Sequence, residues 1–386
     1  MSTPPWFRPA PPRAPDGRSR PILAILGAVG AAALAGGVGF VVGVARGAAL
    51  DPGDAGFARS SPDETNPGAA LDRSRGRMAD SPAEIPAKGW KDIVRRTWGE
   101  IGKDRVTSIA AGVTYYAILA LFPAVAAAVA IYGLFTDPMT ITRHFEQVRD
   151  ILPYGAADII GGQLRSVSAK GDGTLGITFA IGLVASLWSA NAGAKALLDA
   201  LNIAYDETEE RSLLKLNAVA LAFTLGGILF VIAALAAFLG VPLALSYLPL
   251  GPAATWAILI GRWVAMAVLV ALGLAVLYRY GPDRREPRWR WITVGSAAAS
   301  VGWLVASAAL SVYATRFAHY DATYGSLGGI IGLMVWIWVS AIVILVGAEL
   351  NAEVEHQTAR DSTVGRRKPL GTRNATMADT IGQAAE

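Results

Sequence analysis

The sequence contains no cysteine and carries little charge for its length. Across 386 residues, Asp, Glu, Lys and Arg make up 17%. The missing cysteines exclude disulfide bonds, thiolate metal sites and cysteine nucleophiles. Soluble domains usually carry about 25% charged residues, because they need a solvated exterior. The low charge therefore argues against a pair of soluble domains, which the chain length alone would allow.

Motifs of catalysis are also missing. The three histidines, His144, His319 and His356, are scattered, and none belongs to a H-x-H or H-E-x-x-H spacing that would hold a catalytic metal. The chain has neither a G-x-x-x-x-G-K-S/T phosphate loop nor a G-x-S-x-G elbow. We therefore expect no enzyme: no catalytic residues, no metal site, no cofactor and no ATP motor.

Long apolar runs are what the chain has instead. Hydrophobic residues make up 53% of it, and the mean hydropathy is +0.41. The runs are roughly 20 to 28 residues long, enough to cross a hydrocarbon core of about 30 Å. We predict an all-α, polytopic membrane helix bundle with a six-helix core. Its spans are expected at about 106–134, 174–190, 213–240, 253–280, 291–313 and 327–348.

Three segments of the core do not fit a simple span. Residues 88–105 alternate charges with apolar residues at spacings of three and four, which predicts an amphipathic helix lying at the membrane surface. Residues 137–172 and 191–205 are partly amphipathic and too polar to span. Pro123 lies inside the first span and is expected to kink it, because proline removes a backbone hydrogen bond.

The flanks of the core suggest further segments. Residues 1–20, rich in Pro and Arg, are expected to be disordered, as is the tail 356–386. The apolar run 21–45 predicts an extra transmembrane helix; a signal peptide is the alternative. Residues 46–87 read as a linker and 88–355 as the membrane core.

Charge in the loops predicts the orientation of the core. Lys and Arg gather before the first span, after the second, between the fourth and fifth, and in the tail, whereas the loop 241–252 contains none. Basic residues favour the cytoplasmic side, so both ends of the core are expected in the cytoplasm. Although the net charge is +4, we expect membrane lipids as partners and no nucleic acid. A homo-oligomer or partner proteins of the envelope stay open.

Three ordered motifs resemble those of a known family. They are AAGVTYYAILALFP at 110–123, SLWSANAGAKALLDALNIAYDETEER at 186–211, and YGSLGGIIGLMVWIWVSAIVILVGAELNAEVE at 324–355. From about residue 89 to 351 the chain resembles the YihY/BrkB family of bacterial inner-membrane proteins, once misnamed ribonuclease BN. The resemblance implies a six-helix core and an inner-membrane location, and no settled molecular activity.

Polar residues within or beside the spans are the candidate functional residues. A charged side chain at membrane depth is costly and usually faces a cavity or a partner. Glu349, near Asn351, ends the last span, and reads either as a gate or cation-binding carboxylate or as an interfacial group paired with a basic residue of the 279–290 loop. Asp199 and Asn202 share a helix face, which lines a polar cavity or is simply solvated.

Three more candidates lie within the spans. Arg262 reads as a snorkelling side chain or as a substrate-binding one. Tyr115 and Tyr116, shortly before Pro123, line a path or pack between helices. The leading function is an ATP-independent transporter or translocator of an ion, small solute or envelope lipid. The alternative is a non-transporting envelope scaffold that organises membrane, and nuclease activity is not expected.

Overall fold

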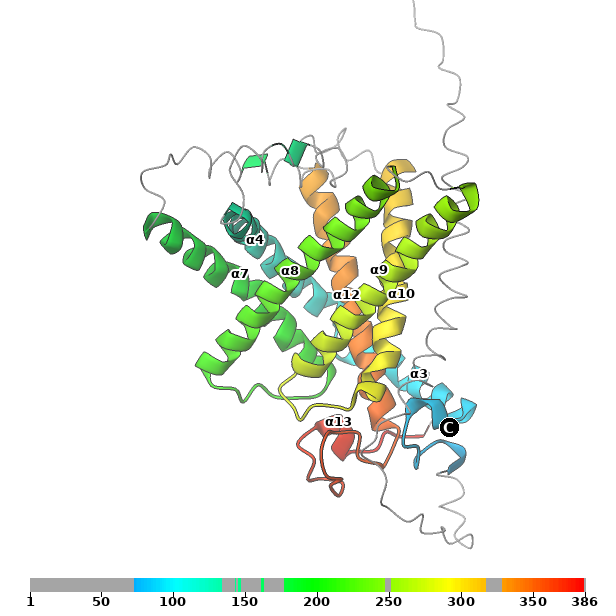
Figure 1. The fold of residues 1–386 in the computed structure, drawn as a ribbon. Coiled ribbons are helices and arrows are strands. Elements are labelled where there is room, and N and C mark those ends of the chain that lie inside the picture. Colours follow the sequence, from blue (N-terminus) through cyan, green and yellow to red (C-terminus); the bar gives the residue numbers. More distant parts are fainter. Residues whose placement is uncertain are drawn as a thin grey trace, which may run out of the picture.

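The computed structural model describes residues 73–133, 143, 145–146, 161–162, 177–246, 251–316 and 328–384, and the fold is that of these residues. Every regular element among them is a helix (Figure 1). A short 3-10 helix, η2, and the amphipathic helix α3 lead into six long helices, and a four-residue helix, α13, closes the chain. Their bounds are η2 Pro82–Glu84, α3 Ala87–Lys103, α4 Val106–Gly133, α7 Ile177–Ala204, α8 Leu213–Ser246, α9 Pro252–Tyr280, α10 Trp289–Arg316, α12 Gly328–His356 and α13 Thr376–Asp379.

The six long helices contain 28 to 34 residues each. Within the described residues, four stretches are long and apolar enough to cross a membrane: Leu213–Ala234, Ile260–Tyr280, Trp289–Tyr313 and Ile330–His356. They lie in α8, α9, α10 and α12. The predicted class, an all-α polytopic bundle, is confirmed.

Two helices differ from their predicted spans. α7 runs without interruption to Ala204, so the polar stretch after residue 190 continues the predicted second span instead of forming a separate segment. α12 continues to His356, eight residues beyond the predicted end, because its polar residues are buried against other parts of the chain. α4 is continuous through Pro123, and the predicted kink stays a prediction.

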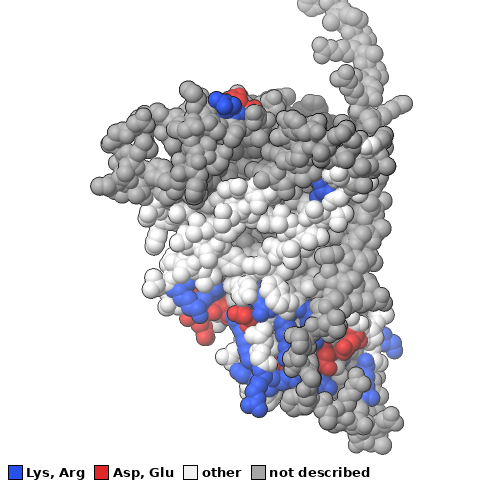
Figure 2. Space-filling model, viewed as in Figure 1, with Lys and Arg blue, Asp and Glu red and all other residues white. Residues whose placement is uncertain are grey.

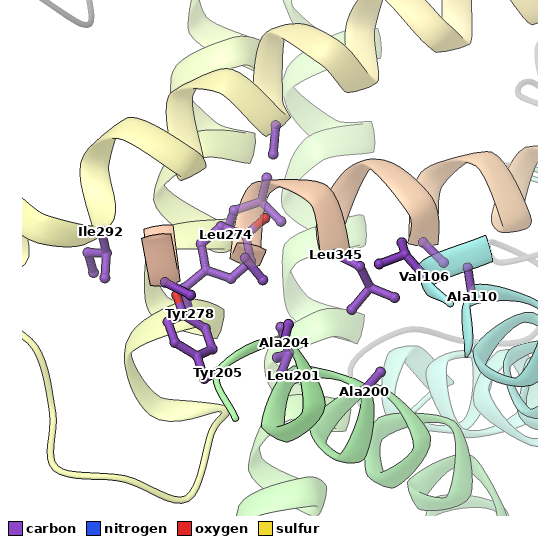
Figure 3. Close-up of a cluster of buried hydrophobic side chains, with 14 of the residues drawn as sticks. Val106, Ala110, Ala200, Leu201, Ala204, Tyr205, Leu274, Tyr278, Ile292 and Leu345 are labelled. Carbon is purple, nitrogen blue, oxygen red and sulfur yellow. The ribbon is translucent and has the colours of Figure 1, made fainter. Parts of the chain in front are cut away.

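One hydrophobic cluster joins five of the long helices at their convergent end (Figure 3). Val106 and Ala110 come from α4, Leu201 from α7, Leu274 from α9 and Leu345 from α12. α10 contributes Ile292 and Ala299, and Met377 of α13 completes the cluster from the end of the chain. Burial of this apolar surface, worth roughly 25 cal/mol per Å2 where water is the alternative, holds the helices together beside the polar loops.

Close approach of α10 and α12 depends on two glycines. A Cβ on Gly347 would lie 2.6 Å from the Cβ of Ala299 and 2.6 Å from the Tyr278 hydroxyl. A Cβ on Gly295 would collide with the Gly347 carbonyl. Small residues let helix backbones approach closely in lipid, and here they bring α9, α10 and α12 into one contact.

Helix α3 lies where the sequence predicts it, but its apolar residues do not all face outward as one stripe. The apolar residues of this helix spread over roughly 140° of its circumference at about 100° per residue. One edge packs inward, where Ile93 is fully buried against Trp291 and Val354. The other edge, with Val94 and Trp98, is exposed. The protein therefore uses half of the stripe as core and leaves the other half open.

Residues 357–384, named here the C-terminal segment, fold onto the bundle instead of forming the expected disordered tail. Arg373 is buried and donates hydrogen bonds to the carbonyls of Lys368, Arg360, Ala359 and Ala378. The composition of the segment is polar, which suggested disorder. Its polar groups are satisfied by other parts of the chain, and that removes the need for a large apolar core.

Charged side chains gather at one end of the bundle, and the surface above them is almost free of charge (Figure 2). We call this the charged end; it comprises α3, the loops 205–212 and 281–288, and the C-terminal segment. The predicted disordered N-terminus, the extra helix at 21–45, most of the 46–87 linker and most of 137–172 lie outside the described residues.

Candidate functional site

The structure separates the seven candidate residues into buried and outward-facing groups. Glu349, Asn351 and Asn202 are 0–2% exposed. Asp199 is exposed, although it lies only three residues from Asn202, because the boundary between the packed and open faces of α7 passes between them. The two residues therefore lie in different environments, Asp199 in the open and Asn202 within the packed structure.

Arg262, Tyr115 and Tyr116 lie away from the buried group. Arg262 is half-buried on α9, with its guanidinium over the Trp263 ring at 5.6 Å. The two tyrosines are 61% and 46% exposed on α4 and meet edge to face, with ring centroids 5.3 Å apart. Outward-facing tyrosines on a membrane helix suit contact with lipid or with another protein. They are not placed to line the inside of this bundle.

Asn351 holds two helices together. Its side-chain nitrogen donates to the Ile292 carbonyl at 3.1 Å, and its side-chain oxygen accepts from the Gly295 amide at 2.7 Å. Both groups of the side-chain amide are thereby used on α10, which passes close to α12 at this level. The observed role of Asn351 is structural.

Asn202 joins two loops of the charged end. Its oxygen accepts a hydrogen bond from the Asp283 amide at 2.7 Å, and its nitrogen donates to Glu209 at 2.9 Å. Arg211 adds an ion pair to Glu209 at 2.7 Å and a hydrogen bond to the Gly281 carbonyl. These contacts connect the loop after α7 to the loop after α9, and Asn202 provides two of the hydrogen bonds.

Glu349 differs from every other buried carboxylate of α12. Glu353 pairs with Arg96 at 2.5 Å, and Glu355 pairs with Arg284 at 2.6 Å. Glu349 is 1% exposed, and neither of its oxygens has a hydrogen-bond partner among the described residues. Burying a carboxylate without a partner is costly, so packing alone does not explain this group.

The basic loop does reach the last helix, but at a different residue from the one expected. One of the two interpretations of Glu349 from the sequence pairs it with a basic residue of the 279–290 loop. The structure gives that role to Glu355, whose partner Arg284 belongs to the loop. Ser362 also donates to Glu355 at 2.9 Å, and the Arg284 guanidinium lies 4.2 Å from the centre of the Tyr205 ring. Because α12 extends past its predicted end, the pair falls nearly two turns beyond Glu349.

Asp104, which is not among the candidates from the sequence, lies beside Glu349. It is the C-cap residue of α3, and its carboxyl group interacts with that of Glu349. Burial raises the pKa of Asp104, and the neighbouring carboxylates of Asp206 and Glu100 raise it further, against the opposing effects of Glu349 and Lys103. Asp104, which joins α3 to the interior of α12, therefore loses its proton at a higher pH than a free aspartate does.

Sequence signals for these groups existed but were incomplete. Three glutamates follow one another at 349, 353 and 355 after a long apolar run, and arginines cluster at 95–96 and 284–285. Such a group of glutamates together with two arginine pairs predicts ion pairs between them. The spacing does not reveal which of the three glutamates has no arginine partner, because the pairing depends on how α3 and the 281–288 loop pack against α12.

Comparison with known proteins places this arrangement in a family. The family model described as virulence factor BrkB matches residues 97–370, more than half of the chain. The chain belongs to the BrkB family. The match includes Asp104, Glu349, Glu355 and Arg284, so the buried carboxylates lie within the BrkB region.

Individual relatives agree with this assignment. The ribonuclease-like protein YfkH of Bacillus subtilis is 28% identical over 259 residues, which cover 64% of this chain and 88% of YfkH. A UPF0761 membrane protein of Tolumonas auensis is 36% identical over 98 residues, 25% of this chain and 32% of the relative. One from Vibrio cholerae is 31% identical over 98 residues, with the same coverage. The matched segment therefore spans about a third of each of these two UPF0761 proteins. No solved structure matches it.

Proposed function

We propose that this BrkB-family protein is an ATP-independent transporter or translocator, in which Glu349 is the functional carboxylate. The cargo class is an ion, a small solute or an envelope lipid. The observation that carries the proposal is the burial of Glu349 in a membrane-spanning helix with both oxygens unpartnered. An ionisable group inside a membrane segment is by default a candidate functional group.

The neighbours of Glu349 support this choice. Glu353 and Glu355 lie within two turns of it on the same helix, and each is neutralised by an arginine. A carboxylate kept only for structure is expected to be paired in the same way, because an unpaired buried charge is strongly destabilising. Glu349 therefore has the environment of a group that exchanges a partner during function.

The proposed location is the bacterial inner membrane, with the charged end in the cytoplasm. The BrkB membership supports a membrane location. The arginines and lysines of the charged end support the orientation, because positively charged loops are retained on the cytoplasmic side. Both ends of the core, α3 and the C-terminal segment, belong to that end.

A scaffold is the second candidate, and the charged end favours it. The C-terminal segment, α3 and two interhelical loops form one interlocked surface with its own ion pairs and buried arginines. Such a surface can bind partner proteins without any transport. The proposal also treats the protein as non-enzymatic, and an RNA-cleavage assay on the purified protein tests that part, given the name of YfkH.

Flux into proteoliposomes tests the transport proposal. We would measure proton and potassium movement with entrapped dyes, osmolyte entry by vesicle swelling, and transbilayer movement of a fluorescent phospholipid. Wild-type protein is expected to increase at least one of these rates, and Glu349→Gln to reduce it at least tenfold. Asp199→Asn, a matched loss of an exposed carboxylate, is expected to leave the rate unchanged. No flux above empty vesicles for any probe would favour the scaffold.

A further inference from the structure

Two carboxyl groups from distant parts of the chain meet at the junction of the bundle and the charged end. Glu349 lies in the buried segment of α12, and Asp104 lies between α3 and α4. Glu349 is 1% exposed, and its oxygens have no hydrogen-bond partner among the described residues, although the carboxyl of Asp104 is close enough to interact.

The groups around this pair are mostly acidic. Those that act electrostatically on Glu349 or Asp104 are Glu100 and Lys103 of α3, Tyr205 and Asp206 at the end of α7, and Glu353 of α12.

The nearby cations are already committed. Lys103 pairs with Glu100 at 2.9 Å, and its side chain is 62% exposed. Arg96 is held by Glu353, and it also donates to Gln357. No ion pair joins a described basic side chain to Glu349 or Asp104. The pair therefore carries excess negative charge wherever both groups are ionised.

Two adjacent carboxylates in a buried site cannot easily both be ionised, because they repel each other and lose hydration. A proton held between them removes one charge and supplies a hydrogen-bond donor for the unpartnered oxygens. A metal ion is a poorer occupant, since the described residues contain no group of three His, Cys, Asp or Glu side chains arranged to hold one.

We propose that Asp104 and Glu349 form a proton-binding site, in which the two carboxyl groups share one proton. The proton site rests on the proposed function in one respect only, namely that its proton is the one coupled to translocation. Release of the proton places two negative charges together and drives the α3–α4 turn away from α12. Uptake of the proton draws them together again. The two groups connect the surface helix α3 to the interior of the bundle, so occupancy of the site changes their contact.

Infrared difference spectroscopy on the full-length protein in lipid tests this assignment, because the C=O stretch of a protonated carboxyl is separate from that of a carboxylate. We expect a protonated-carboxyl band in the wild type that disappears as the pH is raised. Glu349→Gln is expected to abolish it. Asp104→Asn is expected to keep a band that disappears at a pH lower by about one unit or more, since the like charge is gone.

Asp199→Asn is the matched control and is expected to titrate like the wild type; the native fold of each variant is checked by circular dichroism. A band that persists in Glu349→Gln, or an Asp104→Asn titration equal to that of the wild type, would overturn the shared site. Loss of the band on addition of Na+ or K+ at constant pH would assign the site to a metal cation instead. If the protein transports a probe but shows no protonated-carboxyl band, the proton site is refuted and the transport proposal stands. If the band is present but no probe is transported, only the transport proposal is refuted.

Discussion

Arg284 and Glu355 form a 2.6 Å ion pair in which both side chains are fully buried. The pair joins the loop between α9 and α10 to the end of α12, at the point where Ser362 of the C-terminal segment also donates to Glu355. The attraction between two buried charges offsets the free energy of their lost hydration only when further hydrogen bonds satisfy the remaining donors and acceptors. The charged end therefore depends on all three parts of the chain being in place.

Removal of one partner of this pair is expected to be severe. Glu355→Gln leaves the Arg284 charge buried without a counter-charge, which costs about 3–5 kcal/mol. We expect a large drop in the thermal unfolding temperature of the protein in detergent. Glu286→Gln, on the loop that contains Arg284, is the control. Glu286 is 46% exposed and lies 3.4 Å from Arg279, which keeps its hydrogen bond to the Pro287 carbonyl, and an ion pair with a solvent-exposed carboxylate contributes about 0–1 kcal/mol. Equal losses from the two variants would contradict the structural role of the buried pair.

The contact between α10 and α12 makes a second prediction. A methyl group at Gly347 has no space between Ala299 and the Tyr278 hydroxyl, so Gly347→Ala is expected to force the helices apart and to cost about 1–3 kcal/mol. The unfolding temperature measures this loss. Gly227→Ala on α8, where a Cβ meets nothing within 4 Å, is expected to be neutral or slightly stabilising. A stable Gly347→Ala protein would show that the helices are not in close contact.

Asp361 predicts a dependence on pH. Burial opposes ionisation of this group, but hydrogen bonds from Thr363 and from the Lys368 amide outweigh it and hold the pKa of Asp361 below its ordinary value of 3.8. Because the folded-state pKa is the lower one, ionised Asp361 stabilises the fold above pH 3.8. That contribution is lost as the pH falls through the folded-state value.

Asp361→Asn is therefore expected to lower the unfolding temperature at pH 7, with a difference from the wild type that shrinks on acidification below the ordinary pKa of aspartate. Unfolding curves recorded from neutral to acidic pH measure it. Asp199→Asn, which changes an exposed carboxylate, is expected to follow the wild type throughout. A difference that stays constant with pH would mean that the charge of Asp361 does not contribute.

The long helices were predictable because apolar run length alone determines them. The expected starts at 106, 213 and 253 lie within one residue of the observed starts of α4, α8 and α9. The end of α12 was not predictable in this way. Its last turns contain Glu349, Glu353 and Glu355, which lie beyond the predicted end of the span at 348. Arg96 of α3 and Arg284 of the 281–288 loop pair with the last two of these glutamates, and the sequence does not show those contacts.

The candidate site was only partly predictable. Glu349 is a candidate in the sequence because it ends an apolar run, and the structure buries it without an ion-pair partner among the described residues. Asp104 was not selected, because it appears in the sequence as one more charge of a mixed helix. Asn351 and Asn202 are candidates in the sequence because they are polar, and in the structure each accepts a hydrogen bond from a backbone amide of a neighbouring element. Polarity identifies candidates, whereas pairing depends on tertiary structure.

The fold of the C-terminal segment also determines the order in which the protein can be completed on the ribosome. Arg77 binds the carbonyl of Gly382, and Gln357 binds the carbonyl of Arg75, so residues 305 and 282 positions apart close the same surface. The chain leaves the ribosome from the N-terminus onward, and Arg77 lacks these partners until residues 357–382 have been made. A nascent chain stopped before this segment lacks the carbonyl groups of Gln357 and Gly382 that bind Arg77, so translation of the segment is a condition for completing this surface.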